Sequence, residues 1–121
     1  MSKRILIVED QEDNRRIMRD LLVASGYELI EATTGEEGLA LAERERPDLI
    51  LMDIQLPGLD GYEVTRRIKA NPALKHIPII AVTSYALSGD DQKAFAAGCD
   101  GYVTKPFSPR QLLAKIREYL K

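Results

Sequence analysis

The sequence contains short, almost continuous apolar runs, each of which ends abruptly in a polar residue. The clearest of these runs are residues 5–8, 49–52 and 79–82. Short apolar runs bounded by polar groups are typical of strands that are covered on both faces, as in parallel sheets. Strands are therefore predicted at about residues 4–8, 27–31, 48–52, 78–82 and 100–104.

The intervals between these predicted strands carry the signals of helices. Thr34 with Glu37, and Asp60 with Glu63, have the spacing of a capping box, in which each side chain accepts a bond from the other residue's backbone. Ser88 has the residue type of a further N-cap. The first helix is expected to bury one apolar face, which is made of Ile17, Met18, Leu21 and Leu22.

Five predicted strands alternate with five predicted helices along the chain. This alternation indicates an α/β fold with a doubly wound parallel sheet. Because the crossovers of such sheets are right-handed, few strand orders are available, and the flavodoxin-like order 2-1-3-4-5 is expected. In that order, the first and third strands flank the switch point at which ligands bind.

Composition excludes several classes of protein. The 121 residues suit a single domain over residues 1–121, and the 17 basic residues are interspersed with 19 acidic ones, which argues against a nucleic-acid partner. The single Cys99 fits a reducing compartment. The apolar run at residues 5–8 is too short for a signal peptide or a membrane span, so a cytoplasmic location without a membrane partner is expected.

Polar residues with complementary chemistry follow the predicted strands. Glu9 and Asp10 follow the first strand, Asp53 the third, Thr83 the fourth and Lys105 the fifth. Because the carboxyl ends of parallel strands lie at one edge of a sheet, we expect three carboxylates, a hydroxyl and an ammonium group to share one site.

Three neighbouring carboxylates repel each other and require a cation, for which Mg²⁺ is the natural candidate. Asp10 and Asp53 are the expected direct ligands, Glu9 is expected to act through water, and the backbone carbonyl of Gln55 is a further candidate ligand. Asp53 is also the candidate nucleophile, since carboxylates form aspartyl phosphates. Lys105 would then contact one oxygen of the phosphoryl group.

These residues resemble the receiver domain of bacterial two-component response regulators, over essentially the whole chain. The stand-alone, DivK-type group is the most similar, and no output domain is expected. The resemblance depends on the motifs Glu9-Asp10, Met52-Asp53 with Pro57 and Gly61, Thr83-Ser84-Tyr85-Ala86, and Gly101-Tyr102 with Lys105-Pro106.

The resemblance implies that Asp53 accepts a phosphoryl group from a histidine of a sensor kinase or a phosphotransfer protein. It implies that Glu9 and Asp10 hold Mg²⁺, and that the protein is a signalling component rather than an enzyme. Many receivers carry aspartate where this chain has Glu9, and receivers with glutamate there remain competent.

The resemblance also implies a conformational switch. Thr83 would move toward the phosphoryl group and Tyr102 would turn inward behind it, while Lys105 bonds the phosphoryl group and the Lys105-Pro106 peptide is cis. A downstream protein would bind the face built from residues about 84–120. The unphosphorylated chain is expected to be a monomer, and dimerisation on phosphorylation is left open.

The same residues argue against two other functions. A hydrolase with an aspartyl nucleophile typically needs an acid at position 55, where this chain has Gln55, and a nucleotide-binding module would need a glycine-rich turn where residues 9–13 are mostly acidic. A degenerate receiver that acts only as an interaction module is the remaining alternative.

Gln55 and Tyr85 are expected to tune the phosphoryl lifetime, and Tyr85→Ala should speed dephosphorylation.

Overall fold

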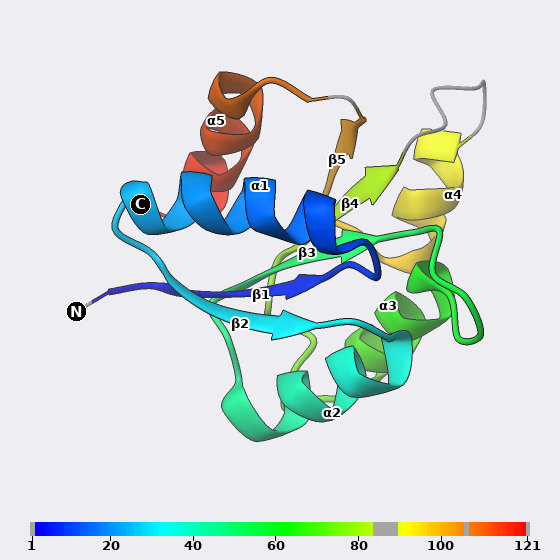
Figure 1. The fold of residues 1–121 in the computed structure, drawn as a ribbon. Helices are drawn as coiled ribbons and strands as arrows, with labels where there is room; N and C mark the ends of the chain where they lie inside the picture. The colour runs from blue at the N-terminus through cyan, green and yellow to red at the C-terminus, as the bar shows by residue number, and fades with distance from the viewer. Residues whose placement is uncertain (1, 84–89, 106, 121) are drawn as a thin grey trace.

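The computed structural model describes residues 2–83, 90–105 and 107–120, with the backbone alone at residues 90 and 91. Strands and helices alternate through these residues (Figure 1). Within them, no helix has the length and apolar character required to cross a lipid bilayer. The elements are β1 (Arg4–Val8), α1 (Glu12–Ala24), β2 (Glu28–Ala32), α2 (Gly35–Glu45), β3 (Leu49–Asp53), α3 (Gly61–Ala70), β4 (Ile79–Thr83), α4 (Asp90–Ala97), β5 (Gly101–Thr104) and α5 (Pro109–Tyr119).

The five strands form one parallel sheet in the order β2-β1-β3-β4-β5. This result confirms the predicted fold class and strand order. From β1 the chain continues to β2 on one side of the sheet, whereas from β3 it continues to β4 on the other side. The switch point therefore lies between β1 and β3. The register pairs Val8 with Met52 and Asp53 with Val82, so the residues that follow β1 lie next to the end of β3.

Strand side chains alternate between two apolar cores, one on each face of the sheet. On β1, Leu6 and Val8 face the core that α2, α3 and α4 cover, whereas Ile5 and Ile7 face the core beneath α1 and α5 (Figure 1). Because both faces are covered, every residue of the three central strands except Arg4 is buried, which explains their continuous apolar runs.

The predicted strand bounds were wrong by one residue at several ends, and the difference matters for the site. β3 and β4 end at Asp53 and Thr83 rather than at residues 52 and 82, and β2 is shifted in the same way. The hydrogen-bonded ladder continues past the apolar runs, since Ile54 N–H donates to the Val82 carbonyl at 3.1 Å. Asp53 and Thr83 are therefore the last residues of rigid strands and not the first residues of loops.

The two predicted capping boxes are only partly formed. Thr34 Oγ1 accepts from Glu37 N–H at 3.0 Å, but the Glu37 carboxylate bonds the N–H of Thr33 rather than that of Thr34. Asp60 Oδ1 accepts from Glu63 N–H at 2.9 Å, while the Glu63 carboxylate is bonded by arginines of its own helix. Each helix therefore has its N-cap bond without the reciprocal one.

The expected apolar face of α1 was too wide. Met18 and Leu22 are buried in the core beneath α1 and α5, but Ile17 is 55% exposed. Ile17 lies five positions from Leu22 and thus well around the helix from the side that meets the sheet. The predicted N-cap Ser88 lies outside the described residues.

Candidate functional site

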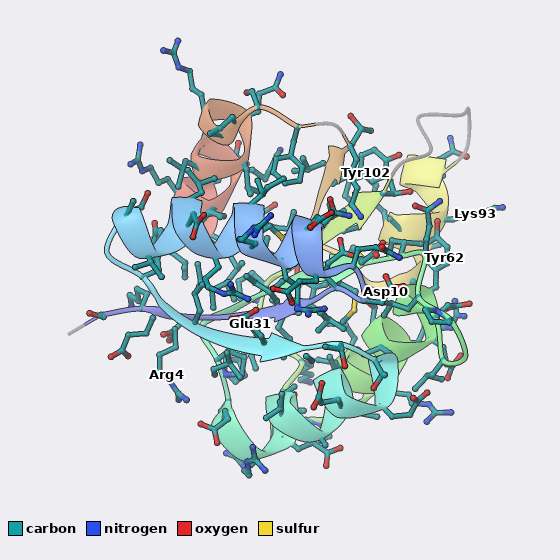
Figure 2. All side chains as sticks on the ribbon, in the orientation of Figure 1. Arg4, Asp10, Glu31, Tyr62, Lys93 and Tyr102 are labelled. Carbon is teal, nitrogen blue, oxygen red and sulfur yellow. The ribbon has the colours of Figure 1, made fainter. Side chains whose placement is uncertain are left out.

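The carboxyl edge of the sheet gathers the polar residues that the strand order predicts to meet there. Glu9 and Asp10 follow β1, Asp53 ends β3, Thr83 ends β4 and Lys105 follows β5. Figure 2 shows Asp10 at this edge, at the start of the segment that leads into α1. The edge lies at the β1–β3 switch point, which is where ligands bind in open α/β sheets.

Three carboxylates form a tight cluster at this edge. Oxygen atoms of Glu9, Asp10 and Asp53 lie within 4.8 Å of one another. Glu9 is 0% exposed and Asp53 is 3% exposed, so water cannot disperse their charge. Burial, with a hydrogen bond to Asp53, raises the pKa of Glu9 from its ordinary value of 4.5 to about 7, although the Lys105 ammonium group opposes the shift. The surrounding groups therefore offset the repulsion among these carboxylates only in part.

Lys105 supplies a positive charge inside the cluster. Its Nζ lies 2.7 Å from Glu9 Oε1 and 3.6 Å from Asp53 Oδ2. An ammonium group that bridges two buried carboxylates shows that the site favours a cation. All three clustered acids offer hard oxygen ligands, and one of them, Asp10, is only half-buried and accessible from solvent. This donor set fits Mg²⁺, which prefers carboxylate oxygens and retains several waters.

The Asp53 carboxylate is oriented by the turn that follows it. Gln55 N–H donates to Asp53 Oδ1 at 3.0 Å, which places the Gln55 backbone beside the acid. Gly61 begins α3 directly against this turn: a Cβ at Gly61 would lie 2.4 Å from the Asp53 carbonyl oxygen. Only glycine allows this close approach, so the start of α3 holds the backbone of the central acid in place.

Thr83 and Tyr102 lie on the face of the sheet that α4 covers. Thr83 is 2% exposed at the end of β4, and the half-buried Tyr102 packs against the core on that face. The register pairs Tyr102 with Ala81, two positions before Thr83. The side chains of Thr83 and Tyr102 therefore lie on the same face of two neighbouring strands, and Thr83 is two positions nearer the carboxyl edge of the sheet. Two other predicted features, Tyr85 and the Lys105-Pro106 peptide, lie outside the described residues.

Sequence reasoning missed two groups that contact Glu9. Gln11 N–H donates to Glu9 Oε2 at 3.2 Å, and Arg15 Nη1 donates to the Glu9 carbonyl oxygen at 2.9 Å. In the sequence, a basic residue one turn into the helix that follows an acidic pair is only a weak indication that it contacts that pair. Its meaning depends on which side of α1 faces the sheet, and this is visible only in the folded chain.

Comparison with known proteins places these residues in a recognisable context. Residues 5–117 match the family model described as the response regulator receiver domain. The polar-differentiation response regulator DivK of Brucella anthropi is 49% identical over 120 residues, which span 99% of this chain and 98% of that protein. The similarity therefore extends over nearly the full length of both chains.

Solved structures give the same result. The receiver domain of the sensor histidine kinase PA1611 from Pseudomonas aeruginosa PAO1 has a TM-score of 0.92 and 38% identity, with 99% of this chain and 98% of that chain covered. That structure holds a magnesium ion coordinated in its active-site cleft. A CheY-like receiver domain protein from Methanospirillum hungatei JF-1 has a TM-score of 0.91 and 38% identity, covering 99% of this chain and 94% of that one.

Proposed function

The chain belongs to the response regulator receiver family, as its motifs predicted, and we propose that it accepts a phosphoryl group on Asp53 in a two-component phosphorelay. Receivers of two-component systems act with histidine kinases, so the donor is a phosphorylated histidine of a sensor kinase or of a phosphotransfer protein. The observation that supports this function best is the environment of Asp53. It is a buried carboxylate at the end of a rigid strand, with an ammonium group and two further acids within reach.

The transfer is a displacement at phosphorus. An Asp53 carboxylate oxygen forms a bond to the phosphorus while the bond between phosphorus and the donor imidazole nitrogen breaks, and the electron pair returns to that nitrogen. Lys105 would leave Glu9 to contact a phosphoryl oxygen, and the Thr83 hydroxyl would donate to another. Such a reaction is driven by positioning and charge stabilisation, and fixed strand ends supply both.

A divalent cation is the proposed cofactor. Asp10 and Asp53 would hold Mg²⁺ directly, Glu9 through water, and the carbonyl of Gln55 would complete the protein ligands. When bound, the ion neutralises negative charge on the phosphoryl oxygens. The raised pKa of Glu9 supports this assignment, because a carboxylate that is costly to ionise alone becomes stable beside a cation.

The output is proposed to be a change in partner binding. Movement of Thr83 toward the phosphoryl group would open space into which Tyr102 turns, since both lie on the same face of neighbouring strands. That movement would alter the face of residues about 84–120, where a downstream protein would bind. A few kcal/mol between the two conformations suffices for one phosphate to shift the population.

Two roles are compatible with this chemistry: a shuttle that passes the phosphate to a phosphotransfer protein, and an allosteric switch that docks on a target. We propose a single receiver domain over residues 1–121 that acts in the cytoplasm as a monomer before phosphorylation, and as a signalling protein rather than an enzyme. The alternative of a degenerate interaction module is disfavoured by the complete set of acids and by Lys105.

Incubation with phosphoramidate, a small donor with a phosphorus–nitrogen bond, tests the function. Intact-mass spectrometry should detect one phosphoryl adduct in MgCl₂ and none in EDTA. Asp53→Asn keeps the size of the side chain and should give no adduct. A folded protein that gains no adduct under any condition would identify a degenerate receiver.

A further inference from the structure

We infer that Arg15 is a positioning residue that sets the geometry of the acidic metal site. Arg15 lies on α1 and touches none of the three clustered carboxylates through a described contact. One of its hydrogen bonds is to the backbone carbonyl of Glu9, the residue between β1 and Asp10. The inference rests on the proposed Mg²⁺ site and adds a residue that determines how well this site is built.

Arg15 is held on several sides. Its side chain is 12% exposed; Nη1 donates to the Glu9 carbonyl oxygen at 2.9 Å, Nη2 donates to Glu12, and Nε lies 3.6 Å from Glu31 Oε1. These partners belong to the segment after β1, to the start of α1 and to β2. A planar guanidinium group with five donors can bridge three such partners at once, and lysine cannot reproduce this arrangement.

The contact to Glu9 fixes the peptide that joins two proposed ligands. Glu9 N–H donates to the Ala32 carbonyl at 3.0 Å, so the strand ladder holds the amino side of Glu9. Its carbonyl side is held by Arg15. Because the peptide group is planar, a fixed Glu9 carbonyl also fixes the N–H and Cα of Asp10. That peptide therefore sets the position from which the half-buried Asp10 side chain projects, while Gln11 Nε2 donates to Asp10 Oδ2 at 3.4 Å.

If Arg15 acted only through its charge, its replacement would change the affinity for Mg²⁺ in the opposite direction from the loss of a positioning bond. A guanidinium group near the cluster repels a divalent cation, so removal of its charge would strengthen Mg²⁺ binding. Removal of a positioning bond would weaken binding, because Asp10 would leave the cluster more often. The sign of the change in affinity therefore separates the two explanations.

The chain offers a matched control in Arg19, one turn further along α1. Arg19 shares two of the partners of Arg15: Nε and Nη2 each lie 2.8 Å from oxygens of Glu31, and Nη2 lies 3.6 Å from Glu12 Oε1. None of its described contacts involves Glu9. Arg15→Met and Arg19→Met remove the same charge from the same network, and only the first removes the bond to the Glu9 carbonyl.

Isothermal titration calorimetry of each folded variant with MgCl₂ measures the affinity for Mg²⁺. We expect Arg15→Met to weaken Mg²⁺ binding about tenfold, as loss of a group that orients a ligand commonly does. Arg19→Met should stay within about twofold of the wild type, in line with its lack of contact with the ligand backbone. Without metal, amide hydrogen exchange at Asp10 and Gln11 should accelerate in Arg15→Met and stay unchanged in Arg19→Met.

Three results would overturn the inference: tighter Mg²⁺ binding in Arg15→Met, equal weakening in both variants, or unchanged exchange at Asp10 and Gln11 in Arg15→Met. Failure of the wild type to bind Mg²⁺ would instead refute the proposed metal site. The exchange measurement needs no metal, so it would still show whether Arg15 holds the Glu9–Asp10 peptide.

Discussion

In the unphosphorylated site, the shorter of the two ion pairs that Lys105 makes is the one with Glu9. The longer arm of glutamate carries its carboxylate to 2.7 Å from the Lys105 ammonium group, whereas Asp53 lies 3.6 Å from it. Lys105 is therefore engaged mainly by Glu9 before any phosphate arrives. Both binding of a metal ion and phosphorylation would have to rearrange this pair.

The raised pKa of Glu9 predicts how the stability of the metal-free protein depends on pH. Between pH 4.5 and about 7 the unfolded chain loses the Glu9 proton while the native protein keeps it. The native state then binds more protons, so this residue makes the free energy of unfolding fall as pH rises through that window and level off above it. The fall should be about 2–3 kcal/mol, given about 1.4 kcal/mol per pH unit.

Urea unfolding in EDTA from pH 4.5 to 8 measures this effect. Other carboxylates, such as Glu31, have lowered pKa values and act in the opposite direction, so the wild type must be compared with Glu9→Gln. The difference in stability between the two proteins should change across the window. A constant difference would show that Glu9 does not titrate there.

Lys105→Met should destabilise the metal-free protein most at alkaline pH. It removes the ammonium group from two buried acids, at a cost of about 3–5 kcal/mol at pH 8, which is above the raised pKa of Glu9. The cost should shrink near pH 6, where Glu9 takes a proton, and Mg²⁺ should restore part of it. Lys115→Met removes a surface lysine paired with Glu118 and should change the unfolding midpoint little. Equal losses in both variants would contradict the buried pair.

At the scale of elements, the site depends on how closely α3 approaches β3. Gly61 is the first residue of α3, and the atoms that a Cβ would meet there are backbone atoms of Asp53 and Ile54, at 2.4 and 2.8 Å. Backbone cannot move aside as the end of a side chain can. The start of α3 therefore transmits any displacement directly to Asp53.

Gly61→Ala should cost about 1–3 kcal/mol through overpacking and slow phosphorylation of Asp53 severalfold. Gly38→Ala is the matched control on α2, because the three atoms nearest to its Cβ would belong to the Val8 side chain and not to backbone, the nearest at 2.8 Å. That variant should be destabilised while its phosphorylation rate stays near that of the wild type. Equal rates in the two variants would show that contact with the Asp53 backbone is unimportant.

The elements themselves are largely predictable from the sequence, and the contacts between them are not. Apolar runs identified the three central strands, because burial on both faces determines their composition. The sheet order followed from the alternation of strands with helices and from right-handed crossovers. The strand ends were displaced by one residue, because hydrogen bonds from neighbouring strands extend the ladder to Asp53 and Thr83. Ile17 was wrongly assigned to the core and Arg15 was missed, since the side of α1 that meets the sheet is decided by packing.

At the scale of the whole molecule, binding of metal and folding are linked. The three acids lie at the carboxyl ends of two strands that are far apart in the sequence, so the unfolded chain does not hold them together. An ion that binds only the native protein therefore stabilises all of it. MgCl₂ at about 100 times the dissociation constant should add about 2.7 kcal/mol. For a chain of this size the melting temperature should rise by roughly 10 °C.

Differential scanning calorimetry of the wild type and of Asp10→Asn, with and without MgCl₂, measures this linkage. Asp10→Asn removes a charge from the least buried member of the cluster and should abolish most of the rise. NaCl at matched ionic strength controls for general screening. A rise of the same size in the variant would show that Mg²⁺ acts elsewhere.

The central claim is that the phosphoryl group resides on Asp53, and chemical mapping of the acyl phosphate tests it most directly. The protein is incubated with acetyl phosphate and Mg²⁺, reduced with borohydride, which converts an aspartyl phosphate into homoserine, and digested for peptide mass spectrometry. The account predicts homoserine at position 53 alone, and none when Mg²⁺ is omitted. Homoserine at another aspartate, or a phosphate that survives on a different residue type, would contradict it.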